Sequence, residues 1–164
     1  MAAKEEEVVK DPSFKMVLAQ INRKYGAGTV GKIEDFTHLG KKLSTGITKL
    51  DEDLGGGIPL GRIAQFYGLQ SSGKSVLAQN LVADAQRQGL DAFWFDCEGT
   101  FDKAWAQKLG VDTDKLGMSQ EAVAERVFEM IKKLLTARPG IIVVDSVASM
   151  RSEKEFEEED FSKE

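Results

Sequence analysis

Residues 68–75 read Gly-Leu-Gln-Ser-Ser-Gly-Lys-Ser, the spacing of a phosphate-binding loop: a glycine, four residues, and then Gly-Lys-Ser. Residues 62–67, just before it, predict a buried strand, and residues 76–83 predict a helix. A strand, a glycine-containing loop and a helix in this order direct successive backbone N–H groups and the positive end of the helix at one anion. The pattern therefore predicts a nucleotide-binding site; the alternative is a glycine- and serine-rich turn that caps an ordinary helix.

Individual residues of this loop have predictable roles. Gly68 and Gly73 permit backbone dihedrals and a close approach that a Cβ would block. Lys74 would place its ammonium against the β- and γ-phosphates, and the Ser75 hydroxyl would ligate Mg²⁺. Lys74 is also a predicted catalytic residue. The predicted nucleotide-contacting residues are Gly68, Leu69, Gln70, Ser71, Ser72, Gly73, Lys74, Ser75 and Val76.

The composition is that of a globular protein, and 164 residues are enough for one domain with a core. The net charge of −5 is concentrated at the end of the chain, where residues 151–164 hold seven acidic and three basic residues. This balance argues against a surface dominated by a DNA-binding patch. The single cysteine and single histidine, Cys97 and His38, exclude an internal disulfide framework and a structural zinc site. With no apolar run long enough to cross a bilayer and no signal core, we expect a cytoplasmic protein without a membrane partner.

The N-terminal region predicts one amphipathic helix and a short strand. Asp11 is a plausible N-cap with Pro12 at the first helical position, and Gly26 ends the helix. Residues 28–33 follow as a possible strand. One stripe of the helix is apolar, and it would pack either on the protein's own core or on a neighbouring subunit: Phe14, Leu18, Ile21 and Tyr25.

Beyond the N-terminal region, helices and strands alternate, which indicates an α/β domain with a mostly parallel sheet flanked by helices. The predicted strands after the phosphate-binding loop are residues 91–96, 115–118 and 141–145. The predicted helices are residues 49–54, the helix that Gly89 ends, residues 102–109, and a long helix that Ser119 caps and residues 138–140 break. The last fourteen residues are rich in glutamate and have little to bury, so we expect them to be solvated or flexible.

Two acidic side chains follow predicted strands, where they can meet the phosphate-binding loop. Asp145 ends the apolar strand 141–145, and there its carboxylate could hold Mg²⁺, with Ser146 assisting through its hydroxyl. Glu98 follows the strand 91–96 and could orient or deprotonate the water that attacks the γ-phosphate. The alternatives are an aspartate that caps a turn and an acidic loop without a catalytic role.

Asp102 and Trp105 are spaced so that both can face one way from a helical turn. The indole could stack on an adenine, and the carboxylate could accept its amino hydrogens. The residues alone favour Trp105 as a core residue. Cys97 is most simply a small buried hydrophobe.

The arrangement of these motifs is similar to that of the RecA-type recombinase family. The similarity covers most of residues 12–150, in the family's order, and lies in residues 43–51, 56–63, 67–75, 95–98, 106–112 and 143–150. It implies an ATPase that uses Mg²⁺, forms filaments on single-stranded DNA, searches for homology and exchanges strands. Glu98 matches the glutamate that activates water and Asp145 the aspartate associated with Mg²⁺. Asp102 and Trp105 match the adenine-contacting positions, where the family commonly has tyrosine as the aromatic residue.

The resemblance also implies a division of the chain. Residues 1–38 would form a helix-and-strand oligomerisation element, in which residues 11–36 dock on the next protomer of a filament. Residues 39–150 would form a RecA-like P-loop ATPase core, and residues 151–164 an acidic, flexible tail.

Two departures from the family's pattern bear on function. Gln70 stands where many members have glutamate, which should be tolerated because the loop binds through its backbone. The family continues after the region of Asp145 with two DNA-binding loops, further strands and residues that reach ATP. We therefore expect an N-terminal portion of a recombinase or a shortened relative, which would contact single-stranded DNA mainly through segments not present here. Its sheet would be incomplete, so the chain would be marginally stable or associate with a partner.

Three alternatives to a DNA-dependent recombinase ATPase remain. The first is a non-catalytic nucleotide-binding or filament-docking module, and the second is a related motor ATPase of the helicase or clock type. The third is a GTPase, because residues 48–51 resemble a guanine-specifying motif and residues 96–99 a DxxG turn. The guanine motif would then precede the phosphate-binding loop instead of following it, which disfavours that assignment.

Overall fold

The computed structural model describes residues 13–31 and 40–156, and the chain divides into two compact units, residues 1–40 and 41–164. In the first unit, helix α1 spans Phe14–Tyr25 with Ser13 at its N-cap. The predicted N-cap Asp11 is therefore wrong, and Asp11 and Pro12 themselves lie outside the described residues. The helix ends at Gly26, as predicted.

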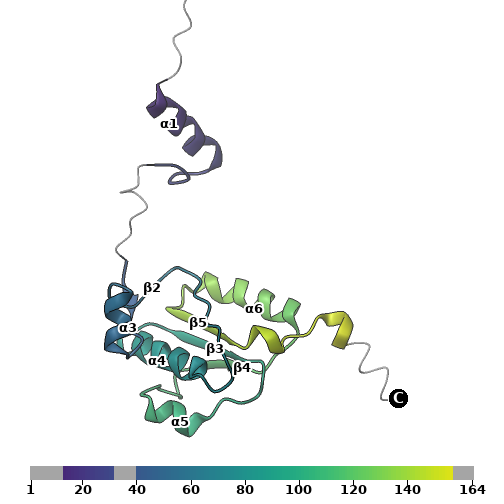
Figure 1. Ribbon diagram of the computed structural model, residues 1–164. Coiled ribbons are helices and arrows are strands. Elements are labelled where there is room, and N and C mark those ends of the chain that lie inside the picture. Colours follow the sequence, from purple (N-terminus) through teal and green to yellow (C-terminus); the bar gives the residue numbers. More distant parts are fainter. Residues whose placement is uncertain (1–12, 32–39, 157–164) are drawn as a thin grey trace, which may run out of the picture. The chain divides into compact units, whose positions relative to one another are not determined.

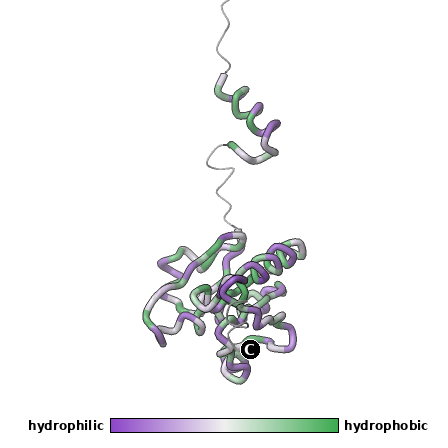
Figure 2. Tube along the Cα trace, turned by 90° about the vertical axis from the view of Figure 1, so that its right-hand side faces the viewer, coloured by the Kyte–Doolittle hydropathy of each residue, from purple (hydrophilic) through white to green (hydrophobic). Residues whose placement is uncertain are grey.

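None of the residues of α1 is buried, and apolar and hydrophilic residues alternate along it (Figure 2). Two members of the predicted stripe, Phe14 and Tyr25, are among the most exposed large side chains described. The Asn22 side chain donates from Nδ2 to Val30 O at 2.7 Å and accepts from Val30 N at Oδ1 at 2.9 Å. These two hydrogen bonds fold the following turn back onto the helix. The described part of the predicted strand, residues 28–31, forms turns and bends instead; residues 32 and 33 lie outside the described part.

The second unit is built on a parallel three-stranded sheet in the order β4-β3-β5. The strands span Ala92–Asp96 (β3), Gly117–Ser119 (β4) and Ile141–Asp145 (β5). The predictions for β3 and β5 are confirmed, and β4 begins two residues later than predicted. The sheet therefore confirms an α/β fold with parallel strands.

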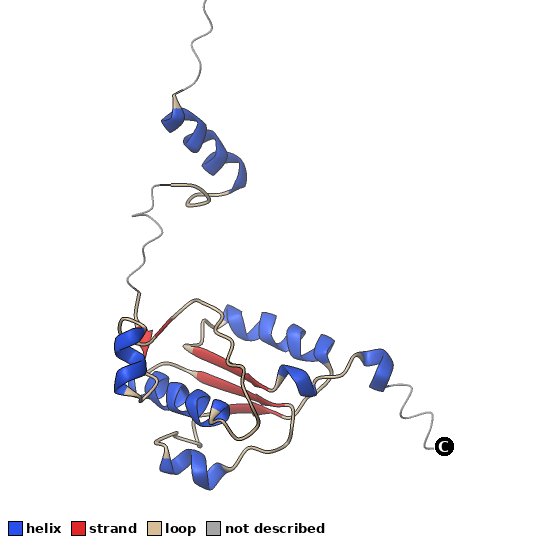
Figure 3. Ribbon diagram, viewed as in Figure 1, coloured by secondary structure: helices blue, strands red, loops and turns tan. Residues whose placement is uncertain are grey.

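Helices cover both sides of this sheet. Figures 1 and 3 show the strands between α6 on one side and the pair of α4 and α5 on the other. These helices span Lys74–Arg87 (α4), Lys103–Lys108 (α5) and Ala124–Thr136 (α6). Side chains of β3 alternate between the two sides: Trp94 packs in a cluster with α4 and with Ala106 of α5, and Phe95, the next residue along the strand, is also fully buried.

The predicted strand before the phosphate-binding loop is wrong. Residues 62–67 form no strand, and all but the half-buried Phe66 are exposed. Ile63 is fully exposed, at 101% of its reference area. Residues 40–61 form a small ribbon instead, in which β1 (Lys42–Leu43) pairs antiparallel with β2 (Ile58–Pro59), together with helix α3 (Thr48–Asp53). Helix α3 confirms the short helix predicted here.

Two further details differ from the predictions. Ser119 is the last residue of β4 and does not cap α6, whose N-cap is Val123. After β5, the chain makes a 3₁₀ turn, η1 (Val147–Ser149). The backbone of Arg151 then forms a parallel bridge with the residues at the start of α6: Arg151 N donates to Ala122 O at 2.9 Å, and Ala124 N donates to Arg151 O at 2.8 Å. The acidic composition did not predict this defined structure after residue 150. No helix in residues 13–31 or 40–156 is long and apolar enough to span a bilayer.

Candidate functional site

The loop at residues 68–75 ends where α4 begins. Gly73 is the N-cap of α4 and has left-handed dihedrals, φ 90° and ψ 14°, which glycine adopts without strain. Ser71 also has a positive φ, 60°, which is uncommon for a serine outside functional loops. The first bond of the helix runs from Leu77 N to Gly73 O at 2.9 Å, so the amides of residues 74–76 have no acceptor within the helix. The loop therefore presents free N–H groups and the positive end of a fourteen-residue helix.

Lys74 bends back over this loop. Its Nζ donates to the carbonyl oxygens of Leu69 at 2.9 Å and Gly68 at 3.2 Å. An ammonium held above the loop carbonyls is placed to meet an anion bound by the amides, and it can exchange these carbonyls for phosphate oxygens. Leu69 and the residues between it and Gly73 are exposed, so an incoming ligand can reach the loop.

The carboxyl ends of β3 and β5 lie side by side. Asp96 and Asp145 are register partners in this parallel pair, and Cys97 N donates to Asp145 O at 2.9 Å. The Asp96 carboxylate is buried and accepts from the amides of Thr100 at 3.0 Å and Phe101 at 3.2 Å. Asp96 therefore holds the loop that carries Glu98, a structural role that was not predicted from the sequence.

Glu98 lies on that loop, and one of its oxygens, Oε1, is held by two hydroxyls. Ser146 donates to Oε1 at 2.7 Å and Ser149 at 3.0 Å. These bonds hold the pKa of Glu98 below its usual value, with the Ser146 hydroxyl as the largest cause and the positive charge of Lys74 as a smaller one. The charge of Lys74 thus contributes to the lowered pKa of Glu98, which links the loop electrostatically to the predicted base. The sequence predicted an assisting role for Ser146 and no role for Ser149.

The predicted Mg²⁺ ligands, Ser75 and Asp145, lie at the first turn of α4 and at the end of β5. A hydroxyl and a carboxylate are the oxygen donors that Mg²⁺ prefers, and this ion usually takes its other ligands from water and phosphate. The described residues contain no group of three His, Cys, Asp or Glu side chains that could hold a metal ion alone. The two side chains have the chemistry of Mg²⁺ ligands, and their joint binding of an ion that arrives with a nucleotide remains a prediction. Burial raises the pKa of the neighbouring Cys97 thiol, and the charges of Asp96 and Asp145 raise it further.

Asp102 and Trp105 belong to the start of α5. Asp102 is the N-cap, and its Oδ1 accepts from Trp105 N at 2.9 Å. Trp105 is 46% exposed, so the preference for a core residue is wrong. The indole lies under the ammonium of Lys108, 5.8 Å from the ring centroid. An exposed indole can stack on a base, and the contact with adenine remains a prediction.

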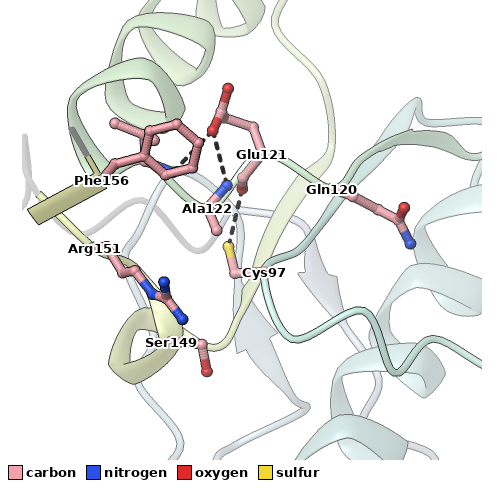
Figure 4. Close-up of a pocket in the computed structure, with 8 residues that line it drawn as sticks. Cys97, Gln120, Glu121, Ala122, Ser149, Arg151 and Phe156 are labelled. Carbon is pink, nitrogen blue, oxygen red and sulfur yellow. Dashed lines mark hydrogen bonds between the residues drawn. The ribbon is translucent and has the colours of Figure 1, made fainter. Parts of the chain in front are cut away.

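A cavity of about 220 Å³ is lined by residues that follow β3, β4 and β5 (Figure 4). Cys97, Ser149, Arg151 and Phe156 line it, with residues 120–123 on the side of β4 and α6. The Cys97 thiol donates to Glu121 O at 3.4 Å across it. The half-buried thiol therefore has a partner, rather than being simply a small hydrophobe in the core.

A family model described as the RecA N-terminal domain matches residues 12–163. The chain is 38% identical over 163 residues to a protein named Protein RecA from Synechococcus elongatus, an alignment that covers 97% of this chain and 46% of the relative. It is 40% identical over 153 residues to Protein RecA from Colwellia psychrerythraea, with 90% of this chain and 44% of the relative covered. For Protein RecA from Gloeobacter violaceus, the identity is 38% over 156 residues, with 94% and 42% covered. The chain thus spans less than half the length of these relatives. On the family model and these identities, the chain belongs to the RecA family.

Proposed function

We propose that this chain is an ATP-binding, DNA-dependent ATPase of homologous recombination, which forms filaments on single-stranded DNA and promotes strand exchange. ATP with Mg²⁺ would bind at residues 68–76. Lys74 would neutralise the β- and γ-phosphates, Ser75 and Asp145 would hold the ion, and Asp102 and Trp105 would contact the adenine. Glu98 would orient and deprotonate the attacking water.

One observation carries the proposal: β3 and β5 end side by side, the Ser146 hydroxyl after β5 donates to Glu98 after β3, and the charge of Lys74 also acts on Glu98. The loop before α4 supplies free amides and an ammonium, β3 leads to Glu98, and β5 ends in Asp145. Phosphoryl transfer asks a protein mainly for positioning and charge neutralisation, which these groups can supply. The exposed apolar residues of α1 support the further part of the proposal, in which residues 11–36 dock on a neighbouring protomer.

ATP binding and hydrolysis, measured with and without single-stranded DNA, test the proposal. In the unchanged chain we expect ATP binding, and turnover that DNA stimulates. Lys74→Ala should weaken ATP binding roughly 10- to 100-fold, because it removes a charge-assisted contact. Lys49→Ala is a matched control, since Lys49 forms an exposed ion pair with Asp53 far from the loop in sequence. No ATP binding by the unchanged chain would refute the proposal.

A second candidate is a nucleotide-binding or filament-docking module without turnover of its own. The observation that favours it is the exposure of residues 62–67, immediately before the loop. A phosphate-binding loop whose approach is not held in a sheet can bind a ligand and still lack the rigid geometry that hydrolysis needs. Tight ATP binding that Lys74→Ala weakens, with no turnover in the presence of DNA, would favour this candidate over the first.

A further inference from the structure

Glu98, Ser146 and Ser149 form a cluster of three oxygen atoms at the carboxyl end of β5. Besides their contacts with Glu98 Oε1, the two serine hydroxyls lie 2.9 Å apart. Each hydroxyl has one hydrogen, so the cluster holds two hydrogens for three close contacts when Glu98 is ionised. Ser149 therefore either donates directly to Oε1 or donates to Ser146, which donates in turn. In both cases its hydrogen stabilises the negative charge of Glu98.

The turn that carries these hydroxyls is held from both ends. Ser146 follows β5, whose five residues pair with β3, and Ser149 ends η1. Arg151, two residues later, is fixed by its backbone pairing with residues 122 and 124. A side chain supported in this way has a defined position, which is what a reacting group needs from the residues around it.

The serine hydroxyls anchor only one oxygen of the Glu98 carboxylate. Among the described residues, hydrogen bonds to Glu98 reach Oε1, and none reaches Oε2. Anchoring one oxygen restricts rotation of the carboxylate and leaves the other oxygen as an acceptor. That is the arrangement expected of a base that must take a proton from water in a fixed direction.

We propose that Ser149, together with Ser146, is a positioning residue that holds the Glu98 carboxylate by Oε1 and leaves Oε2 to meet the attacking water. This inference rests on the proposed function, because it assumes that Glu98 is the base. It adds a residue, Ser149, that acts through Glu98 without touching the nucleotide.

The direct test is the titration of the Glu98 side-chain carboxyl, followed by carbon NMR in the full chain without nucleotide. Asp96 and Lys74 also act on this carboxyl, and both remain in every variant. Ser149→Ala should raise the pKa of Glu98 toward its ordinary value, because one hydrogen that stabilises the charge is lost. Ser149→Thr keeps a hydroxyl and should restore the low value. Ser152→Ala removes a nearby hydroxyl that accepts from Glu155 N, and it should leave Glu98 unchanged.

Kinetics separate a positioning role from a merely structural one. In a chain that hydrolyses ATP, Ser149→Ala should lower kcat roughly 10-fold, a part of the roughly 100- to 10,000-fold that a positioned base contributes. Both KM and ATP affinity should stay unchanged, and the acid limb of the pH profile should move to higher pH. In a chain that binds ATP without turnover, the proposal is tested by the Glu98 titration alone: the pKa should rise in Ser149→Ala and return to its low value in Ser149→Thr.

Three results would overturn the proposal: an unchanged Glu98 titration in Ser149→Ala, an equal shift in Ser152→Ala, or no rescue by Ser149→Thr. These outcomes are distinct from failure of the proposed function. A chain that does not bind ATP refutes that function, and with it the catalytic meaning of the contact. An unchanged titration in a chain that binds ATP refutes only the positioning by Ser149.

Discussion

Two apolar segments of similar length lead into the candidate site, and they differ in what surrounds them. Strand β3 has a strand on each side, and four of its five residues are buried. Residues 62–67 pair with no strand in the described part of the chain, and most of their side chains are exposed. Both segments have the composition of a buried strand. The difference teaches that an apolar pattern allows a segment to form a strand, but that the segment is buried only where neighbouring strands pair with it.

Truncation of one aromatic side chain in β3 should have the largest effect. Phe95 is fully buried, and Phe95→Ala should lower the free energy of unfolding by about 3 to 5 kcal/mol, through lost burial and the cavity left behind. Ile63→Ala, in the exposed segment, should change it by about 0.5 kcal/mol or less. Urea unfolding measures both. Should Phe95→Ala fail to fold, Phe95→Leu replaces it, with an expected loss under about 1.5 kcal/mol.

A substantial loss in Ile63→Ala would break the comparison. It would mean that residues 62–67 are buried in solution, against a second copy of the chain or another surface. Repeating the unfolding at several protein concentrations distinguishes association from burial within one chain, because only association makes the loss concentration-dependent.

A second prediction concerns the edge of the sheet opposite β5. A Cβ added to Gly117 of β4 would lie 2.5 Å from the Phe93 ring of β3, which is too close for any ordinary contact. Gly117→Ala should therefore cost about 1 to 3 kcal/mol. Phe93→Leu in the same chain should recover part of this loss, and the double-mutant cycle measures the coupling. Purely additive losses would show that the ring moves aside without cost.

Sequence patterns predicted the parts of the molecule whose causes are local. Helix α5 lies between Asp102 and Leu109 as expected, α4 ends just before Gly89, and β5 begins just after Gly140. The misses have causes elsewhere in the chain. Ser119 suits a helix cap, but pairing with β3 places it in a strand.

In the candidate site, too, features with a local cause could be predicted and features that depend on distant residues could not. The loop at residues 68–75 and the acids after β3 and β5 could be predicted, because their spacing and their place after apolar strands are local signals. The contact between Ser149 and Glu98 joins residues 51 positions apart, and it depends on how β5 and its turn are held. Such a contact has no local signal, except that Ser149 follows Ser146 by three residues, the spacing of one 3₁₀ turn.

The third prediction separates capping from ligand binding at Asp102. Its carboxylate caps α5, and Asp102→Ala should cost about 1 kcal/mol of stability because the Trp105 amide loses its acceptor. Asp102→Asn keeps an acceptor oxygen and should cost less. Thermal unfolding measures the cap, and ATP affinity in the same two variants measures any contact with adenine. A loss of ATP affinity in Asp102→Asn, with stability retained, would assign the carboxylate a role in binding as well.

The smallest expected effect is a pH dependence at the ribbon of residues 40–61, where one carboxylate adds local hydrogen bonds to a short two-stranded pairing. Asp51 accepts from the Ser44 hydroxyl at 2.6 Å and from the Thr45 hydroxyl and amide at 2.7 and 2.9 Å. These bonds, the Ser44 hydroxyl first, hold the pKa of Asp51 below its ordinary value of 3.8. A lowered pKa in the folded state stabilises the protein fully above the ordinary value, and the stabilisation is lost as pH falls through the folded value.

Asp51→Asn should therefore make the free energy of unfolding fall less steeply below about pH 4, while stability near neutral pH drops because an amide cannot replace both oxygens as acceptors. The matched control is Asp53→Asn, which removes an exposed ion pair with Lys49 and should leave the acid slope nearly unchanged. Urea unfolding between about pH 7 and pH 3 compares the three chains. Parallel curves for all of them would mean that the ribbon does not depend on this carboxylate. Residues 40–61 would then owe their structure to packing against α4, as β3 owes its burial to the strands beside it.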